Sequence, residues 1–237
     1  MGKTFIIARR ETIAYLTSPS MYVIAAVFAG ITGYFFVDGI SVPFPEATVS
    51  PYAGAIMLAL VFIAPALTMR LFAEELRLGT LDLVMSAPVN EWQVTLGKYV
   101  GVLVPFAFML MVTLFFTALL YWLGTPDSGP ILTAYLGLFL YGAAALAVGL
   151  WASSITANQA LAAVVGIGLL VLFSVTQIAA ASTTGWIADV LQMLSIVDHF
   201  ANFRRGVFDL SDVAYYVSLI ATFLFLCVRT LESRRWL

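Results

Sequence analysis

RLFAEELRLGTLDLVMSAPVNEWQVTLGK, residues 70–98, is a polar stretch between two long apolar segments, and it decides the fold of the chain. It holds seven of the 24 charged residues (11 basic and 13 acidic), although charged residues make up only 10% of the chain. Long apolar segments form membrane-spanning helices, so we expect residues 70–98 to connect two such helices on one side of the membrane. A connection this large and polar indicates a surface that contacts another molecule.

The composition indicates an integral membrane protein. Of the 237 residues, 62% are hydrophobic, well above the roughly 45–50% of soluble globular domains. The net charge is −2 and the basic residues are scattered, so we expect no nucleic-acid partner. The only cysteine, Cys227, lies in the last apolar segment, where we expect a small buried residue.

Six apolar segments are long enough to cross a bilayer, which takes roughly 20 residues in a helix. They cover residues 19–37, 51–69, 99–123, 131–153, 157–181 and 213–228. Proline and glycine residues break the first and third connections between them. We therefore expect one all-α integral membrane domain over residues 1–237, with six transmembrane helices.

Residues 1–18 predict a helix that lies on the membrane surface before the first span. Four large apolar side chains share one broad face of this helix, which Arg9 interrupts. They are Phe5, Ile6, Ile13 and Leu16. The alternative is a frayed, solvated tail, which fits this many large apolar residues less well. The apolar run that follows is too long for a cleaved signal peptide, so we expect a retained span.

The basic residues predict which parts of the chain face the cytoplasm, because lysine and arginine are retained on that side. Nine of them fall on one side of a six-span arrangement: Lys3, Arg9, Arg10, Arg70, Arg77, Lys98, Arg229, Arg234 and Arg235. Only Arg204 and Arg205 fall on the other side, together with seven acidic residues. We therefore expect a multi-pass protein of the inner or plasma membrane, with both termini and residues 70–98 in the cytoplasm.

Small residues recur at every fourth position on two predicted spans, which predicts close packing between helices. The first span carries Ala25, Ala29 and Gly33, and the fifth carries Asn158, Ala162 and Gly166. Such ridges form contacts within one subunit or between two subunits, and the sequence leaves both open.

No ionisable residue lies well inside any predicted span. Ion-coupled carriers bury such a residue to bind a proton or a sodium ion, so the sequence argues against that class of transporter. The polar residues at depth are neutral, and we expect most of them to form hydrogen bonds between helices. They are Thr113, Thr117, Ser174, Thr176 and Gln177.

The connection over residues 182–212 is too long for a turn and is rich in large apolar residues. The spacing from Trp186 to Leu194 predicts a short amphipathic or re-entrant helix on the outer side. The only histidine, His199, follows Asp198, and no second type of metal ligand is spaced around it. We therefore predict a hydrogen-bonded histidine and no metal site.

The sequence contains no catalytic or nucleotide-binding motif. A serine nucleophile needs a positioned base, and the single histidine lies far in sequence from the serines of the spans. The pair Gly97-Lys98 is followed by Tyr99 and lacks the upstream glycine of a phosphate-binding loop. We expect no catalytic residue and no bound cofactor in this chain, so its energy source lies in another protein.

Residues 74–101 resemble the cytoplasmic loop of the permease subunits of type-2 ABC exporters. The resemblance is carried by EELRLGTLDLVMSAPV (residues 74–89) and WQVTLGKYVG (residues 92–101). The ending RRGVFDLSDVAYYVSLIATFLFLCVRTLESRRW (residues 204–236) is similar, more narrowly, to the branch with gliding-motility permeases and the nitrous-oxide-reductase maturation permease.

The resemblance implies a dimer of permease subunits, identical or different, with two ABC ATPase subunits that bind ATP and magnesium. Residues 80–88 would form a coupling helix in a cleft of the ATPase, and the acidic pair would contact the ATPase or brace the N-terminal helix. The implied coupling residues are Glu74, Glu75, Arg77, Gly79, Thr80, Leu81, Asp82, Met85 and Pro88. From the residues themselves, Gly79 or Thr80 predicts the cap that opens this helix, and Pro88 predicts its end. A second helix is expected to begin near Asn90 and to continue into the third span.

The resemblance also places the first and fifth spans, with their ridges of small residues, along the central path of the dimer. The outer segment would close that path or receive an extracytoplasmic subunit through Trp186, Phe200, Phe203 and Arg204. The expected function is that of a membrane permease subunit that couples ATP hydrolysis to export or to mechanical transmission. The alternative is a membrane scaffold that links cytoplasmic and outer partners without moving a substrate.

Overall fold

The computed structural model describes residues 2–41, 48–81 and 89–234, and all regular structure within these ranges is helical. The helices are α1 (Gly2–Leu16), α2 (Pro19–Ile40), α3 (Ser50–Thr68), α4 (Arg70–Leu78), α6 (Glu91–Leu123), α7 (Ser128–Ile155), α8 (Gln159–Ala181), α9 (Trp186–Leu194), α10 (Ile196–Arg204) and α11 (Leu210–Arg234). Six stretches are long and apolar enough to cross a membrane: α2, α3 continued by α4, α6, α7, α8 and α11. The six predicted spans are therefore confirmed as helices.

The start of α6 confirms the helix predicted near Asn90. The backbone N–H of Asn90 donates to Oε1 of Gln93 at 3.3 Å, as in a capping box at a helix N-terminus. The helix then runs without interruption from Glu91 to Leu123. Residues 91–98 are therefore a helical extension of the third span.

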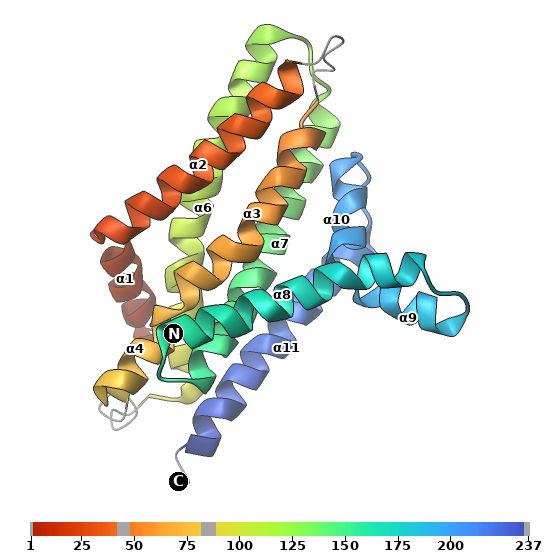
Figure 1. Cartoon of the computed structure of the whole chain (residues 1–237). Helices are drawn as coiled ribbons and strands as arrows, with labels where there is room; N and C mark the ends of the chain where they lie inside the picture. Colours follow the sequence, from red (N-terminus) through yellow and green to blue (C-terminus); the bar gives the residue numbers. More distant parts are fainter. Residues whose placement is uncertain (1, 42–47, 82–88, 235–237) are drawn as a thin grey trace.

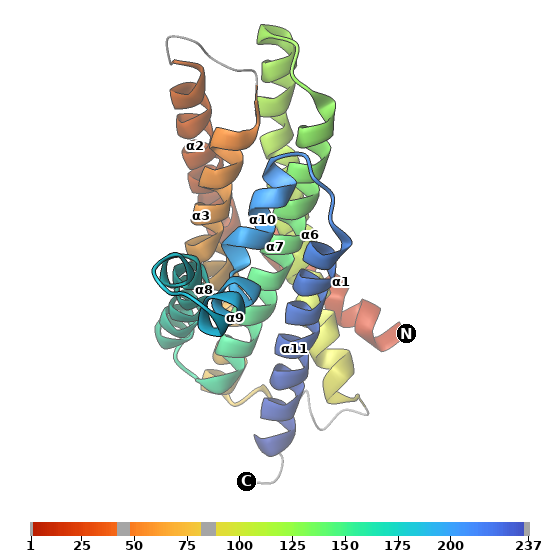
Figure 2. The same cartoon turned by 90° about the vertical axis from the view of Figure 1, so that its right-hand side faces the viewer.

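Helix α7 lies at the centre of the molecule and packs against α3, α6, α8, α10 and α11. Every residue from Tyr141 to Leu150 is buried, and most of them are alanine or glycine. In the view of Figure 2, α2, α3 and α8 lie on one side of α7, and α6 and α11 lie on the other. Of the spanning helices, α2 and α8 are the least buried within the subunit.

Close packing joins α3, α7 and α8, and it depends on two glycines. A Cβ atom added to Gly149 would lie 2.1 Å from Oγ1 of Thr68, and one added to Gly166 would lie 3.1 Å from Cβ of Pro65. The hydroxyl of Thr68 is held in place because it donates to the Ala64 carbonyl at 2.9 Å. The predicted ridge of the fifth span therefore packs within the subunit, on α3 and α7.

A chain of buried hydroxyl groups joins α3, α6 and α7. The hydroxyls of Tyr52 and Thr117 lie 3.0 Å apart, and Thr117 donates to the hydroxyl of Tyr135 at 2.9 Å. Thr113 lies 3.2 Å from the same tyrosine oxygen. The predicted bonds between helices are thus confirmed for Thr113 and Thr117, and Gln177 donates across to Asp198 of α10 at 2.8 Å.

Two other polar residues do not bond between helices. Ser174 donates to the carbonyl of Leu170 and Thr176 to that of Phe173, both within α8. A serine or threonine hydroxyl in a helix reaches the carbonyl three or four residues earlier, and this local bond satisfies it without a neighbouring helix. The prediction, which was made for most of the five residues, therefore holds for three of them, and Ser174 and Thr176 are the exceptions.

We expect Gly149→Ala to destabilise the protein by about 1–3 kcal/mol, because the new methyl group would overlap Thr68 at the contact between α7 and α3. Thermal unfolding of the purified protein in detergent measures the effect. The matched control is Gly168→Ala in α8, where nothing lies within 4 Å of the added Cβ atom. Equal unfolding temperatures for the two variants would contradict the close approach of α3 and α7.

Candidate functional site

Helix α4 is an amphipathic helix that follows α3 after a single residue, Met69. Pro65 lies inside α3 and has no N–H to donate, so the regular bonding of the last turns of α3 is interrupted. In Figure 1, α4 follows the lower end of α3. Leu71 and Phe72 are buried on one face, whereas Arg77 and Leu78 are exposed near its end, Leu78 to 62%.

Gly79 ends α4 in a left-handed conformation, with φ at 67°, which favours glycine. The N–H of Thr80 then donates back to the carbonyl of Glu75 at 3.0 Å. The sequence left Gly79 or Thr80 as the cap of the following helix; Gly79 closes the preceding helix, which leaves Thr80 as the predicted cap. Asp82, Met85 and Pro88, with most of the predicted coupling helix, lie outside the described residues.

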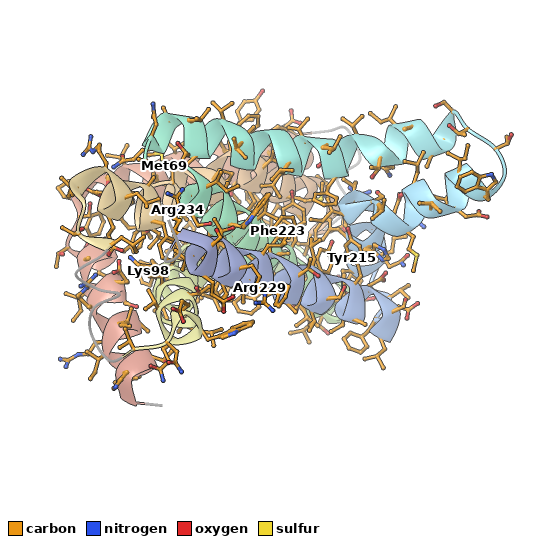
Figure 3. The ribbon with its side chains drawn as sticks, turned by 90° about the horizontal axis from the view of Figure 1, so that it is seen from below. Met69, Lys98, Tyr215, Phe223, Arg229 and Arg234 are labelled. Atoms are coloured by element: carbon orange, nitrogen blue, oxygen red, sulfur yellow. The ribbon has the colours of Figure 1, made fainter. Side chains whose placement is uncertain are left out.

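Lys98 of α6 is the central residue of the site, and its side chain is only 2% exposed. Its ammonium group donates to the Leu71 carbonyl at 2.7 Å and to Oε1 of Glu75 at 2.8 Å. Oε1 of Glu11, on α1, lies 3.5 Å from the ammonium nitrogen of Lys98. Lys98 therefore ties the first turn of α4 and the N-terminal helix to the start of the third span (Figure 3).

Arg10 completes an ion cluster of two basic and two acidic residues from α1, α4 and α6. Its guanidinium lies 2.9 Å from Glu11 and 3.3 Å from Glu75. The hydrogen bond that Arg10 donates to Glu11, reinforced by the charges of Glu11 and Glu75, raises the pKa of Arg10. We call these four residues, Arg10, Glu11, Glu75 and Lys98, the ion cluster.

Helix α1 packs closely on α6 because two glycines of α6 face it. Cβ atoms added to Gly97 and Gly101 would lie 2.8 Å from Ile7 and 2.5 Å from Glu11. The hydroxyl of Thr12 donates to the carbonyl of Gly101 at 3.3 Å. The predicted N-terminal helix is thus present and docked on α6, and its place at the membrane surface stays a prediction.

A second set of contacts fixes the end of α1 to the junction of α3 and α4. The hydroxyl of Tyr15 donates to the Leu67 carbonyl at 2.5 Å, and burial raises its pKa well above the usual value. The guanidinium of Arg70 lies over the Tyr15 ring, 4.4 Å from its centroid, and donates to the hydroxyls of Ser18 and Ser20. These bonds hold the start of α2 beside α4.

A cavity of about 340 Å³ lies between α1 and α4, and all four residues of the ion cluster line it. Glu74 and Glu75 both line it and are both half-buried. The acidic pair is divided by its contacts: the carboxylate of Glu75 pairs with Lys98 and Arg10, whereas Glu74 is not part of the ion cluster. Of the other implied coupling residues, Arg77 and Gly79 are exposed and Leu81 is buried.

The implied path-lining residues occupy different environments. Gly33 faces Phe116 of α6 in the same subunit, and Ala162 is buried. Asn158 caps α8, because its side chain accepts from the N–H groups of Ala160 and Leu161, and it is therefore an N-cap and not part of a packing ridge. The remaining members of the two ridges are Ala25 and Ala29, which are half-buried, and Gly166, which packs on Pro65.

The outer segment forms two helices, α9 and α10, and the first confirms the helix predicted from Trp186 to Leu194. Trp186 is 75% exposed, but Phe200 and Phe203 are 2% and 0% exposed. Phe203 packs on Gly137 of α7, which explains its burial. The side chains of Phe200 and Phe203 are therefore part of the subunit core. They are not exposed to contact a partner subunit, which is the role that the resemblance implied for them.

His199 is hydrogen-bonded, as predicted. Its Nδ1 lies 2.6 Å from Oδ1 of Asp212, and its ring stacks on Tyr215 at a centroid distance of 4.0 Å. Asn202 donates to the other oxygen of Asp212 at 3.0 Å. These contacts fasten α10 to α11. Among the residues described, no three His, Cys, Asp or Glu side chains gather as metal ligands.

Sequence reasoning missed Lys98, Glu11 and Arg10 as members of the site. Glu75 and Lys98 are 23 positions apart and meet only because the chain reverses between α4 and α6. One signal was present: Gly97 and Gly101, spaced by one helical turn, indicate a face that another helix approaches closely.

We expect Lys98→Met to destabilise the protein by about 3 kcal/mol, because it removes the buried cation and leaves two largely buried carboxylates with only the exposed Arg10 as a partner. The docked helix α1 should also become accessible to protease. Thermal unfolding in detergent and limited proteolysis measure the two effects.

The matched control for this prediction is Arg229→Met. Arg229 pairs with Glu232 at 2.8 Å in an exposed pair on α11, and such pairs contribute less than about 1 kcal/mol. If Lys98→Met and Arg229→Met unfold alike and α1 stays protected, the ion cluster does not hold the three helices together.

Comparison with known proteins identifies the family. A family profile described as "ABC-2 family transporter protein" matches residues 5–231, nearly the whole chain. No curated protein matches the sequence. The match agrees with six helices able to span a membrane. The chain therefore belongs to the ABC-2 transporter family, as a multi-pass permease subunit of an ABC transporter, and this family implies an ABC ATPase partner and a permease that is not itself catalytic.

Proposed function

We propose that this permease subunit couples ATP hydrolysis by its ATPase partner to a conformational change of its membrane helices, through α4 and the ion cluster. The observation that carries the proposal is the bond between Lys98 and Glu75, which joins α4 to α6 and, through Arg10 and Glu11, to α1. A force applied to α4 then acts on the second span, the third span and the N-terminal helix at once. The output is export of a substrate or mechanical transmission across the membrane.

The backbone at the two ends of α4 supports a lever of this kind. Pro65 interrupts the backbone hydrogen bonds of α3 before α4 begins, and Gly79 ends α4 in a left-handed conformation. Between them the helix is held to α6 by a charged hydrogen bond, which is stronger than a neutral one. A helix that is stiff along its length and able to turn at its ends transmits displacement without absorbing it.

The exposed residues of α4 supply the surface for the ATPase in this proposal. Arg77 and Leu78 lie together at its end, next to the segment implied as the coupling helix. An exposed leucine beside an arginine is the combination of apolar and charged groups found at protein interfaces. Glu74 extends this surface towards the cavity, whereas Glu75 acts inside the subunit.

The remaining parts of the proposal concern assembly and orientation. Two permease subunits, identical or different, associate through the face of α2 and α8, the least buried spanning helices. The end of the molecule with α4 and the C-terminus faces the cytoplasm of a cell whose inner or plasma membrane holds the protein, as the basic residues predict. The ATPase subunits bind ATP and magnesium. The chain is also proposed to belong to the branch with the gliding-motility and nitrous-oxide-reductase maturation permeases.

We expect the double variant Arg77→Glu/Leu78→Asp to bind the ATPase at least tenfold more weakly, because each change removes an interface contact of more than about 1 kcal/mol. Co-purification from cells that express both subunits, and the ATPase rate of the complex in nanodiscs, measure the loss. The control, Arg229→Glu/Thr230→Asp, puts the same charges on the end of α11. Equal ATPase binding by both double variants would overturn the proposed contact surface.

Glu75→Gln separates coupling from binding. The amide keeps the size of the side chain but loses the charge that attracts Lys98 and Arg10. We therefore expect the ATPase to remain bound while ATP no longer changes the distance between spin labels on α3 and α6. A wild-type complex in which ATP leaves this distance unchanged would favour the scaffold function.

The outer segment is proposed to receive an extracytoplasmic subunit or to close the path, and the exposed Trp186 is its available contact. We expect a cysteine at position 186 to react rapidly with a membrane-impermeant maleimide, and a cysteine at position 203 to react at least tenfold more slowly, because Phe203 is buried. Whole cells treated from outside provide the measurement, with Cys227 replaced by serine. Rapid labelling at position 203 alone would contradict the packing of α10 on α7.

A further inference from the structure

A second cavity, of about 310 Å³, lies between α3, α8 and α10, apart from the ion cluster. Its walls combine small and apolar residues with two polar side chains, an amide and a guanidinium. They are Gly54, Met57, Leu58, Gln177, Val197, Phe200, Ala201 and Arg204. Mostly apolar walls with a few placed polar groups are typical of sites for small molecules.

The guanidinium of Arg204 has no acidic partner in the part of the chain that the structure describes: no carboxylate there lies within 4 Å of it. Its Nε atom is buried and has no hydrogen-bond acceptor. Gly54 makes room for the group, because a Cβ atom there would lie 3.2 Å from Nη1 of Arg204. A half-buried cation in a membrane protein is costly unless an anion compensates it.

The surroundings leave a positive charge uncompensated. A neighbouring cavity of about 490 Å³ shares Gln177 with the first and is also lined by Asp198 and Arg205. The carboxylate of Asp198 already accepts a hydrogen bond from Gln177 at 2.8 Å. Two guanidinium groups and one carboxylate therefore line the pair of cavities. Their net positive charge favours the binding of an anion.

An apolar track leads away from the cavity along α3. Leu58 lines the cavity, and Phe62 follows it one helical turn later on the same face. Each is 59% exposed, although most of α3 is buried. In Figure 1 this helix lies between α2 and α8, on the side of the molecule where these two least buried spans run.

We propose that this cavity binds the anionic headgroup of a membrane lipid, with its phosphate on Arg204 and an acyl chain along Leu58 and Phe62. The volume equals that of about ten water molecules at roughly 30 Å³ each, which suits a phosphate with a few methylene groups and is too small for a helix of another chain. A guanidinium is the side chain best matched to phosphate oxygens. The site stands apart from the ATPase and its coupling, so it does not depend on the proposed function.

The test uses the full-length permease in detergent, titrated with phosphatidylglycerol or phosphatidylcholine and followed by native mass spectrometry. We expect one phosphatidylglycerol per chain and at least tenfold weaker binding of phosphatidylcholine, whose headgroup carries no net charge. Arg204→Gln should weaken phosphatidylglycerol binding by roughly tenfold, the usual effect of losing a hydrogen bond between charged groups. Arg229→Gln removes the same charge at the distant end of α11 and should leave binding unchanged.

Two further variants keep the test decisive if Arg204→Gln fails to fold. Leu58→Asp places a negative charge on the exposed track and should repel the lipid, and Gly54→Ala should displace the guanidinium. Equal binding of the two lipids, or wild-type binding by the folded variants, would overturn the site. Displacement of the lipid by an equal concentration of inorganic phosphate would show that the acyl track contributes nothing, and would overturn the assignment to a lipid.

Discussion

A single buried ammonium group holds together the end of the molecule where α1, α4 and α6 meet. Lys98 reaches a backbone carbonyl of α4 and carboxylates from α4 and α1, so removing its charge would leave these two acids with only the exposed Arg10 as a partner. Such a cluster contributes specificity as well as stability, because only one arrangement of the three helices satisfies all four charges. The placement of α4, and with it the exposed Arg77 and Leu78, depends on this arrangement.

The rest of the molecule is held by packing and by neutral hydrogen bonds. Helix α7 presents alanine and glycine where its neighbours approach, and the hydroxyls of Tyr52, Thr117 and Tyr135 bond to one another. A membrane gives little hydrophobic driving force between helices, so close contact and satisfied polar groups must supply the stability. The body around α7 and the charged end around Lys98 therefore rely on different interactions. This division suits a protein in which one end is moved against a firm body.

The six spans and the N-terminal helix could be predicted because each is encoded by local composition. Apolar length identifies a span, and the capping pair Asn90 and Gln93 marks where α6 begins. The ion cluster could not be predicted, because its members are distant in sequence and meet only after folding. The role of Gly79 stayed open beside that of Thr80 for a related reason: a glycine between two helices can close one or open the next, and only the backbone conformation decides.

The structure of the outer segment could also be predicted from the sequence only in part. Apolar residues from Trp186 to Phe208 predict helices, but the sequence does not say which side chains face the core. Phe203 is covered because Gly137 leaves a space for it on α7, whereas Trp186 has no such neighbour and stays exposed.

The order of the ion cluster along the chain bears on how the protein is made. Glu11 and Glu75 both precede Lys98, so a ribosome delivers the two acids before it delivers the base. The lysine is therefore synthesised after both of its counter-charges. A circular permutant that begins at Asn90 would reverse this order, so that the base would be synthesised before either acid.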